Sequence, residues 1–318
     1  MKLKRLRTFA ASAAVGCLLA AGIGGAAFAS TDDELTVLDA LELTALTDEA
    51  PTLLNNVSAP EDAGIVIPDN SGEPIIVGSG AEEISVQLPG ASVDGEDVGE
   101  GLVGYDGGDG SIAVPIPKDD GSIQLISVIE GAASPTEYRY EFNLPAGASL
   151  SAVEDGGVAV RDEDGEVLYA VLAPWAVDAD GAAVDTRYEV DGTALVQHVA
   201  HTSANAYPVV ADPWLGGTWV QEWSWYSGAT RIAMTPTTFA QWACPGNVSC
   251  ALTWQGVAAT ELANAQVTQA NKNKINASTT RNQIGCHMVA GPLKSPWNLE
   301  TNKPDIGLPG FIATLCNP

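Results

Sequence analysis

Three polar side chains near the end of the chain have the types that acid–base chemistry requires. His287 and Glu300 could meet as a general acid and a general base. Arg281 precedes them and could hold an anionic group. These are the candidate catalytic residues. The alternative is that His287 is a packed or surface residue beside a disulfide, since nothing in the sequence fixes its geometry.

A row of aromatic side chains predicts a second kind of site. Trp219, Trp223 and Trp225 have the same parity and would share one face of a strand. Gln221 lies between them, and rings beside an amide suit stacking on a sugar or a peptide. The candidate ligand-binding residues are therefore Trp223, Trp225 and Gln221. The alternative is core packing, because a small domain needs large side chains in its interior.

Motifs for nucleophiles, phosphates and metals are missing from the sequence. There is no G-x-S-x-G, no G-x-x-x-x-G-K-[ST] and no H-E-x-x-H. His198 and His201 are spaced like metal ligands, but residues three apart on a strand face opposite sides. The acidic runs Asp162–Glu166 and Asp178–Asp185 lack a complete calcium loop, and hairpin turns explain them better. We therefore expect no metal site and no cofactor, with weak Ca²⁺ binding as the minority alternative.

Four cysteines remain once the expected export segment, which contains Cys17, is set aside. They are Cys244, Cys250, Cys286 and Cys316. In an exported chain four cysteines predict two disulfides, with three possible pairings. A zinc site would need short paired spacings on both sides, and the second pair is too far apart for that.

Residues 1–29 have the pattern of a signal peptide. Basic residues come first, an apolar stretch runs from Phe9 to about Ala26, and Ala27–Ala29 is a small-x-small cleavage site. We therefore expect a secreted, extracellular or cell-envelope protein that begins near Ser30. No later segment is apolar enough to span a bilayer after the signal is removed.

Charge divides the remaining chain into two unlike parts. Ser30 to Pro213 holds 36 acidic and 4 basic residues, a net charge of −32. Trp214 to Pro318 holds 4 acidic and 6 basic residues, a net charge of +2, and seven of the eight tryptophans. We place a domain boundary at Asp212–Pro213. The whole chain has a net charge of −26, so we expect no nucleic-acid partner.

Residues 30–75 are expected to form an acidic helix and a linker. Thr31–Glu34 is a capping-box pattern, and Leu35, Leu38 and Leu41 follow on roughly one helical face. The stretch after them is rich in Pro, Asp and Gly, as linkers are. Such a helix either docks a partner, packs on its own domain or is frayed at the terminus.

Residues 76–213 have the two-residue period of β-strands. Glu137–Leu144 alternates without a fault between apolar and polar side chains. Similar runs are Ile84–Leu88, Ile112–Ile116, Ile123–Ile129, Val167–Leu172, Tyr188–Val190 and Leu195–Val199. Asp-Gly occurs eight times and suits tight hairpins. The pattern predicts an all-β antiparallel, sandwich-like domain.

Residues 214–318 predict a small Trp-rich α+β domain. Four elements are expected: a hairpin of Gly217–Tyr226 with Ala229–Met234, a helix capped by Thr235 and begun by Pro236, a helix over Leu252–Gln269, and a short helix within Ile306–Leu315. Pro309-Gly310 interrupts the last of these.

Ordered anchors near the end of the chain resemble a known family. They are Cys286-His287, Pro296–Glu300, Pro304–Gly307 and Cys316–Pro318. The pattern is similar to domain of unknown function 2599, which occurs in exported actinobacterial proteins, and it covers about 100 residues. The acidic β-rich part, which ends at Tyr207–Trp214, is similar to a leader module of such proteins.

The resemblance implies secretion, a modular chain and a Cys286–Cys316 disulfide, but no activity. The other two cysteines bracket a turn at Pro245–Asn247, so we expect a Cys244–Cys250 disulfide as well. The chain departs from the family at Leu308–Gly310, which makes the last helix doubtful.

Together these patterns predict a secreted two-domain binding protein of unknown ligand. The C-terminal domain would be the effector or ligand-contacting part, and its partner a protein or an envelope glycan. One alternative is a secreted hydrolase or toxin-like effector that uses His287 and Glu300. Another is a structural protein of the cell envelope.

Overall fold

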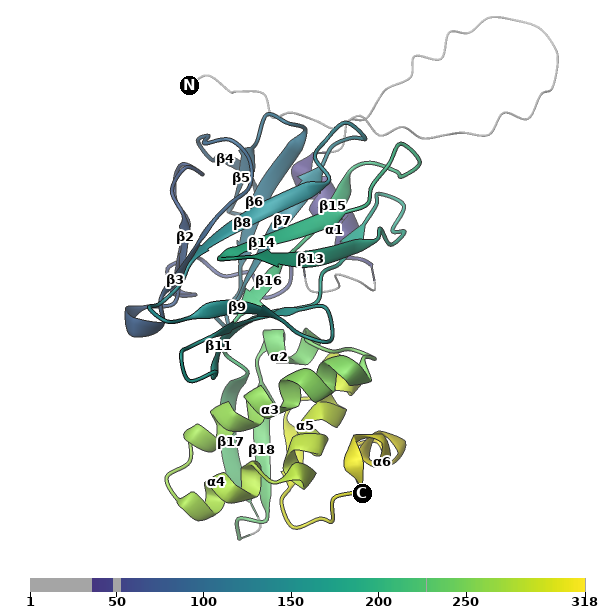
Figure 1. Cartoon of the computed structure of the whole chain (residues 1–318). Coiled ribbons are helices and arrows are strands. Elements are labelled where there is room, and N and C mark those ends of the chain that lie inside the picture. Colours follow the sequence, from purple (N-terminus) through teal and green to yellow (C-terminus); the bar gives the residue numbers. More distant parts are fainter. Residues whose placement is uncertain (1–35, 48–52, 227, 318) are drawn as a thin grey trace, which may run out of the picture.

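The structure is a computed structural model that describes residues 36–47, 53–226 and 228–317 (Figure 1). The expected signal peptide and the Thr31–Glu34 capping box lie outside these residues. The chain has a large antiparallel β region followed by a small α+β domain with two disulfides, which confirms the predicted fold class. None of the described helices is long and apolar enough to cross a membrane.

One sheet of the β region has six strands. They are β1 (Ile65–Val66), β2 (Ile75–Val77), β3 (Ile84–Gln87), β8 (Glu137–Asn143), β13 (Thr186–Asp191) and β14 (Ala194–Val199). Their order is β1-β2-β3-β8-β14-β13, and all neighbours are antiparallel. In β8 every second side chain is buried, so this sheet has one face on the core and the other face in water.

The second sheet has ten strands. They are β4 (Glu96–Gly99), β5 (Leu102–Asp106), β6 (Ser111–Pro117), β7 (Ile123–Ile129), β9 (Ser149–Ala152), β10 (Val158–Arg161), β11 (Val167–Val171), β12 (Ala176–Val177), β15 (Val209–Ala211) and β16 (Trp214–Gly216). The main path is β4-β5-β6-β7-β16-β11-β10-β9, and β15 joins β7 to β12. Because β16 is part of this sheet, the β region extends past the predicted boundary at Asp212–Pro213.

The two sheets pack face to face, and a helix covers the outside of the larger one. Tyr140 and Phe142 of β8 share a core with Ile123 and Leu125 of β7. On the other face of β6 and β7 lie α1 (Val37–Thr44) and the buried Leu53, so both strands are buried at every position. The helix thus packs on its own domain.

The segment predicted to be a linker is built into this fold. Helix α1 is capped by Thr36 in a capping box with Asp39, later in the chain than the box predicted from the sequence. Strands β1 and β2 belong to the six-stranded sheet, and Leu53 is fully buried. The prediction missed this because the apolar residues stand singly between Pro, Asp and Gly, with no clear period.

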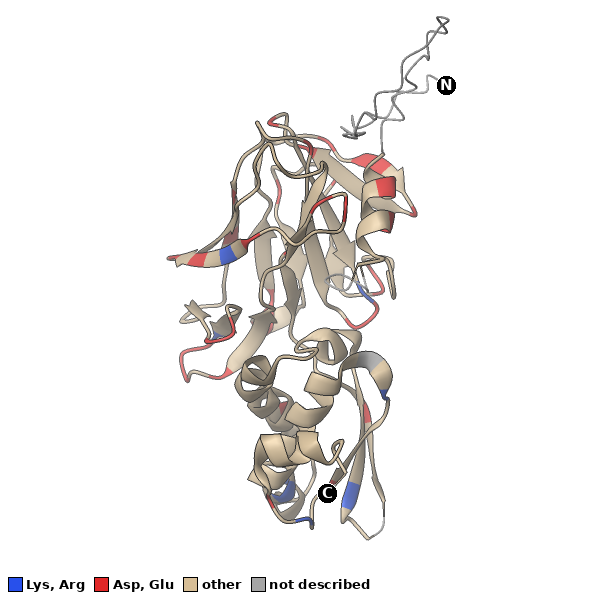
Figure 2. Cartoon of the chain, turned by 90° about the vertical axis from the view of Figure 1, so that its right-hand side faces the viewer, with Lys and Arg blue, Asp and Glu red and all other residues tan. Residues whose placement is uncertain are grey.

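Aspartates of the sandwich bond the backbone of their own turns. Asp162 accepts from the N–H groups of Asp164 and Glu166, and Asp178 accepts from those of Asp180 and Ala182. These are the two runs considered for calcium, and their carboxylates already have backbone donors. Figure 2 shows the acidic residues on the loops and edges of the sandwich, with few on the C-terminal domain.

The C-terminal domain has five described helices and a three-stranded sheet, and the helices pack over one face of the sheet. The strands are β17 (Val220–Tyr226), β18 (Arg231–Pro236) and β19 (Trp297–Glu300), in that order. The helices are α2 (Thr238–Trp242), α3 (Val248–Asn264), α4 (Gln269–Ile275), α5 (Ser278–Ala290) and α6 (Gly307–Ala313), of which α3 to α6 are the four longest. The 3₁₀ turns η1 (Gly80–Glu82) and η2 (Gly291–Leu293) complete the described elements.

Several predicted boundaries in this domain are wrong. Strand β18 continues through Pro236, and Thr237 is the residue that caps α2, through its bond with the Ala240 N–H. The helix predicted over Leu252–Gln269 is α3, which begins four residues earlier and ends five residues earlier, and α4 is a separate helix that the sequence analysis did not predict. Helix α6 forms although Pro309 lies in it, because proline in the first turn loses no intrahelical hydrogen bond.

The two parts of the molecule share a packed junction. The Trp214 ring of β16 meets Phe239 of α2 edge-on, and a side chain at Gly216 would overlap that phenyl ring. Asp155, in the β9–β10 hairpin, accepts a 2.6 Å hydrogen bond from the Trp254 indole of α3. Asp120 accepts from the Phe239 N–H at 2.8 Å. Carboxylates of the acidic region therefore bond uncharged donors of the C-terminal domain.

Candidate functional site

The aromatic row lies on β17, but a bulge interrupts it. The pairing of β17 with β18 shifts between Val220 and Glu222, so Gln221 has no partner on β18. Cross-strand partners share a face of the sheet. Trp223 pairs with Met234, which is buried against the helices, so the row lies on the helix-facing side. Gln221 is exposed in the bulge and does not complete a row of rings.

Trp219 belongs to the core. It is 1% exposed, stacks on Trp254 at 5.7 Å and meets Phe239 edge-on. Glu261 of α3 accepts hydrogen bonds from the Trp219 and Val220 N–H groups, at 2.8 and 3.2 Å. Burial raises the pKa of Glu261 to about 7, although both hydrogen bonds act in the opposite direction. This carboxylate thus fixes the start of β17.

Trp225 is partly buried and held in place. Its indole N–H donates to Gln266 at 2.8 Å, and the Lys274 ammonium lies 5.6 Å from its ring centre. Lys274 also donates to the Ala229 carbonyl at 2.7 Å. These contacts hold the Trp225 ring against the helices.

Trp223 is the most accessible of the three rings. It is 37% exposed, and among the described residues no hydrogen bond to its indole is found. Tyr226, at the end of β17 and on the other face of the sheet, is also exposed and lies under Arg231, with the guanidinium 5.2 Å from the ring centre. Of the three predicted ligand-binding residues, Trp223 and Gln221 are therefore accessible and Trp225 is largely enclosed.

The two edges of the three-stranded sheet differ. At β19, the Gln283 amide of α5 accepts from the Glu300 N–H at 2.8 Å and donates to the Glu300 carbonyl at 3.0 Å. This side chain therefore occupies the place of a neighbouring strand. At β17 only the first residues have such a cover, from Glu261, and beyond them the described residues supply none.

The open edge is formed by the backbone of two tryptophans. Thr301 donates its N–H to the Thr230 carbonyl, so the even-numbered residues of β18 direct their backbone groups toward β19. The odd-numbered ones bond alternate residues within Glu222–Tyr226. The N–H and C=O groups of Trp223 and Trp225 therefore point out of the sheet.

His287 is a core residue of the C-terminal domain. It is 1% exposed, and its ring stacks on Trp297 at 5.6 Å with an interplanar angle of 9°. Burial, with a smaller effect of Lys294, lowers the pKa of His287 to about 4, so the ring is neutral at pH 7. Its Nε2 atom is buried without a hydrogen-bond partner. An enclosed imidazole of this kind has no route to a substrate.

The structure does not bring the candidate catalytic residues together. Trp297, on which His287 stacks, faces the helices, whereas Glu300 has the opposite parity on β19 and faces the other side. Arg281 lines a cavity of about 780 Å³ between α3 and the β10–β11 hairpin. The three side chains thus lie in three separate places. The enzyme hypothesis loses the one constellation on which it rested.

The histidine pair of the sandwich is also separated. His198 lies between Glu137 and Glu189, at 3.4 and 3.1 Å, while His201 contacts the Tyr207 hydroxyl and the Pro135 carbonyl. Within the described residues, no group of three or more His, Cys, Asp or Glu side chains is arranged to hold a metal ion.

Sequence reasoning missed the side chains that shape the edges of the sheet. Gln283, Glu261 and Gln266 are polar residues of helices and carry no motif. The sequence gives little signal for them. Helix α5 has almost no apolar face, and a helix that is buried through polar contacts is hard to recognise from its sequence.

An antiparallel β-sandwich joined to a small disulfide-bonded α+β domain is the class of protein that this geometry defines. Residues 219–318 match the model of a protein family of unknown function, DUF2599. The predicted resemblance of the C-terminal domain is therefore confirmed, and the match begins at Trp219, just after the last strand of the sandwich. No curated protein is significantly similar to the chain.

Proposed function

We propose that this chain is a secreted binding protein whose C-terminal domain adds an extended segment of a protein partner to the open edge of β17. Export is supported by the signal pattern in residues 1–29 and by two disulfides, Cys244–Cys250 and Cys286–Cys316. The contact would use the backbone of Trp223 and Trp225 and the exposed Trp223 ring.

The unpaired β17 edge is the observation that carries this function. A strand with free N–H and C=O groups is a template for another strand, and proteins usually cover or charge such edges. Here the opposite edge is covered by Gln283, and β17 has one charged residue, Glu222. Main-chain hydrogen bonds would give affinity and the Trp223 ring would give specificity.

Peptide selection combined with hydrogen exchange tests the proposal. Extended peptides are selected from a displayed library on the chain, and amide exchange is measured with and without them. We expect bound peptides to protect the Trp223 and Trp225 amides, which exchange quickly in the unliganded chain, more than those of Glu222 and Ser224. Peptides that protect only residues of the sandwich would contradict a site on the C-terminal domain.

Three alanine variants separate binding from folding. Trp223→Ala should weaken peptide binding by about 2 kcal/mol while leaving the melting temperature nearly unchanged. Trp219→Ala should lower the unfolding free energy by about 3–5 kcal/mol, because its ring is core. Trp225→Ala should lower the unfolding free energy by an amount between the effects of the other two variants. If Trp223→Ala melts at as low a temperature as Trp219→Ala, the Trp223 ring is part of the core. The proposal that this ring contacts the ligand would then be wrong.

A further inference from the structure

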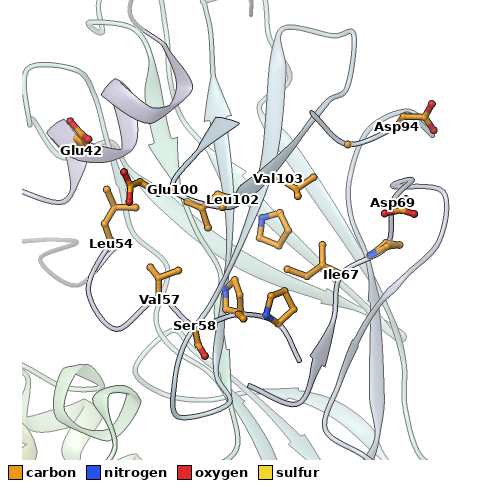
Figure 3. Close-up of a pocket in the computed structure, with 17 residues that line it drawn as sticks. Glu42, Leu54, Val57, Ser58, Ile67, Asp69, Asp94, Glu100, Leu102 and Val103 are labelled. Atoms are coloured by element: carbon orange, nitrogen blue, oxygen red, sulfur yellow. The ribbon is translucent and has the colours of Figure 1, made fainter. Parts of the chain in front are cut away.

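A second cavity lies on the sandwich, away from the C-terminal domain. It has a volume of about 900 Å³, within the usual range of ligand pockets, about 300–1,000 Å³ (Figure 3). It lies between β5, β6, Glu42 of α1 and residues 54–69. Nothing in the proposed contact at β17 uses it.

Two prolines explain why the cavity exists. Gly107 donates to the Ser111 carbonyl, so the odd-numbered residues of β6 direct their backbone groups toward β5. Pro115 and Pro117 are odd-numbered and have no N–H to donate. Pairing of β5 with β6 accordingly ends at Tyr105–Ala113. Farther along, Ser58 donates to the Pro117 carbonyl in place of β5, and the cavity lies between these two partners.

The lining is apolar in the middle and acidic at both ends. Leu54, Val57, Ile67 and Val103 form the middle together with four prolines. Figure 3 shows Glu42 and Glu100 at one end and Asp69 and Asp94 at the other. No Lys or Arg is among the described residues that line the cavity.

Other contacts support this placement of the carboxylates. Helix α1 packs against β4, which puts Glu42 near the strand end that precedes Glu100. Asn70 donates to Asp94 at 2.9 Å, and the Gly95 N–H donates to the Asp69 carbonyl at 2.8 Å. Glu42 lies in the last turn of α1, where the helix dipole adds further negative potential.

We infer that this cavity binds an extended peptide segment with a basic residue on each side of a short apolar stretch. Apolar side chains of the segment would fill the space between the prolines, and its two cations would meet the carboxylate pairs at the ends. Such charge placement favours one class of partner and repels acidic ones. The chain would then have two separate peptide contacts, one on each domain.

Binding of a defined probe tests this inference. The probe is a blocked pentapeptide, lysine–leucine–valine–leucine–lysine, and the control peptide has glutamate in place of both lysines. We expect the basic probe to bind the full chain and the acidic one not to bind. Affinity should fall as salt is raised, because the end contacts are exposed ion pairs.

Variants at the two ends locate the site. The double variant Asp94→Asn with Glu100→Gln should bind the probe about fivefold more weakly or worse. Ala59→Trp, which places a bulky ring at an exposed position of the lining, should abolish binding. The matched control Glu163→Gln changes an equally exposed carboxylate of the β10–β11 hairpin and should bind as the original chain does.

Several outcomes would overturn the inference. They are equal binding of the acidic and basic probes, unchanged binding by Ala59→Trp, and a free diamine that binds as tightly as the peptide. Trp223→Ala should leave probe binding intact, so failure of the β17 contact and failure of this cavity can be told apart.

Discussion

In the sandwich, aspartates of several turns bond the backbone a few residues ahead of them, whereas in the C-terminal domain side chains from distant helices bond the backbone at the edges of the three-stranded sheet. Asp162 bonds residues two and four positions ahead of it. Gln283 instead bonds the backbone of Glu300, and Glu261 bonds that of Trp219. Local bonds of the first kind can be found from the local sequence, and bonds between distant segments cannot.

Within this comparison the largest expected effect concerns the disulfides, which among the described residues only the C-terminal domain has. Replacing both Cys286 and Cys316 with Ser should lower the unfolding free energy by about 3.6 kcal/mol, because that disulfide closes a long loop. The matched double variant replaces Cys244 and Cys250 with Ser. It removes a disulfide that closes a short loop, and it should lower the unfolding free energy by about 2.3 kcal/mol. Urea unfolding followed by tryptophan fluorescence measures both. A larger loss from the short loop would contradict the loop-length argument.

Seven strands of the sandwich, β3, β6, β7, β8, β11, β13 and β14, could be predicted because the pattern of apolar residues in each strand reflects which of its faces are buried. Ile123–Ile129 is β7 to the residue, and Glu137–Leu144 exceeds β8 by one residue. Both sides of β7 are buried, so its run is mostly apolar, and one side of β8 is buried, so its run alternates. The Asp-Gly turns between strands are equally local signals.

The C-terminal domain was harder to predict because its helices bury polar residues. Helix α5 buries Gln283 and His287, which contact Glu300 and Trp297 on another element. Helix α5 has no periodic apolar face from which it could be predicted, and the sequence analysis did not find it. The prediction that the three tryptophans share one face of a strand was also wrong, because a bulge at Gln221 shifts the register of β17 by one residue.

A smaller effect should follow from opening the covered edge of the three-stranded sheet. Gln283→Leu leaves the Glu300 N–H and carbonyl without their partner, and an unsatisfied buried group costs about 1–3 kcal/mol. Thermal melts should show this loss, and the Glu300 amide should exchange faster. Gln269→Leu, at an exposed position of α4, is the control and should be nearly neutral. If the two variants have the same melting temperature, the Gln283 side chain does not stabilise the β19 edge by bonding its backbone in place of a neighbouring strand.

Per pH unit, the smallest expected effect is a pH dependence that belongs to the sandwich. Lys118 is fully buried after β6 and donates to the Leu53 carbonyl at 2.6 Å and to the Asn55 carbonyl at 3.1 Å. Burial lowers its pKa from 10.5 to about 7, although Asp120 and Asp119 act in the opposite direction. Between these values the unfolded chain binds more protons than the folded chain, so stability should rise with pH, by at most about 1.4 kcal/mol per pH unit.

Urea unfolding from pH 7 to about 9.5 should show this rise, before tyrosines of the unfolded chain begin to titrate. Lys118→Met should lose the rise, and it should also be less stable at every pH because two carbonyls lose a donor. Lys272→Met, on helix α4 of the C-terminal domain, should keep the rise and is the control. If stability is flat with pH in the original chain, or still rises in Lys118→Met, the ammonium is not the group that titrates. The buried positive charge would then not distinguish the sandwich, and Lys118 would hold the α1-to-β1 segment through hydrogen bonds alone.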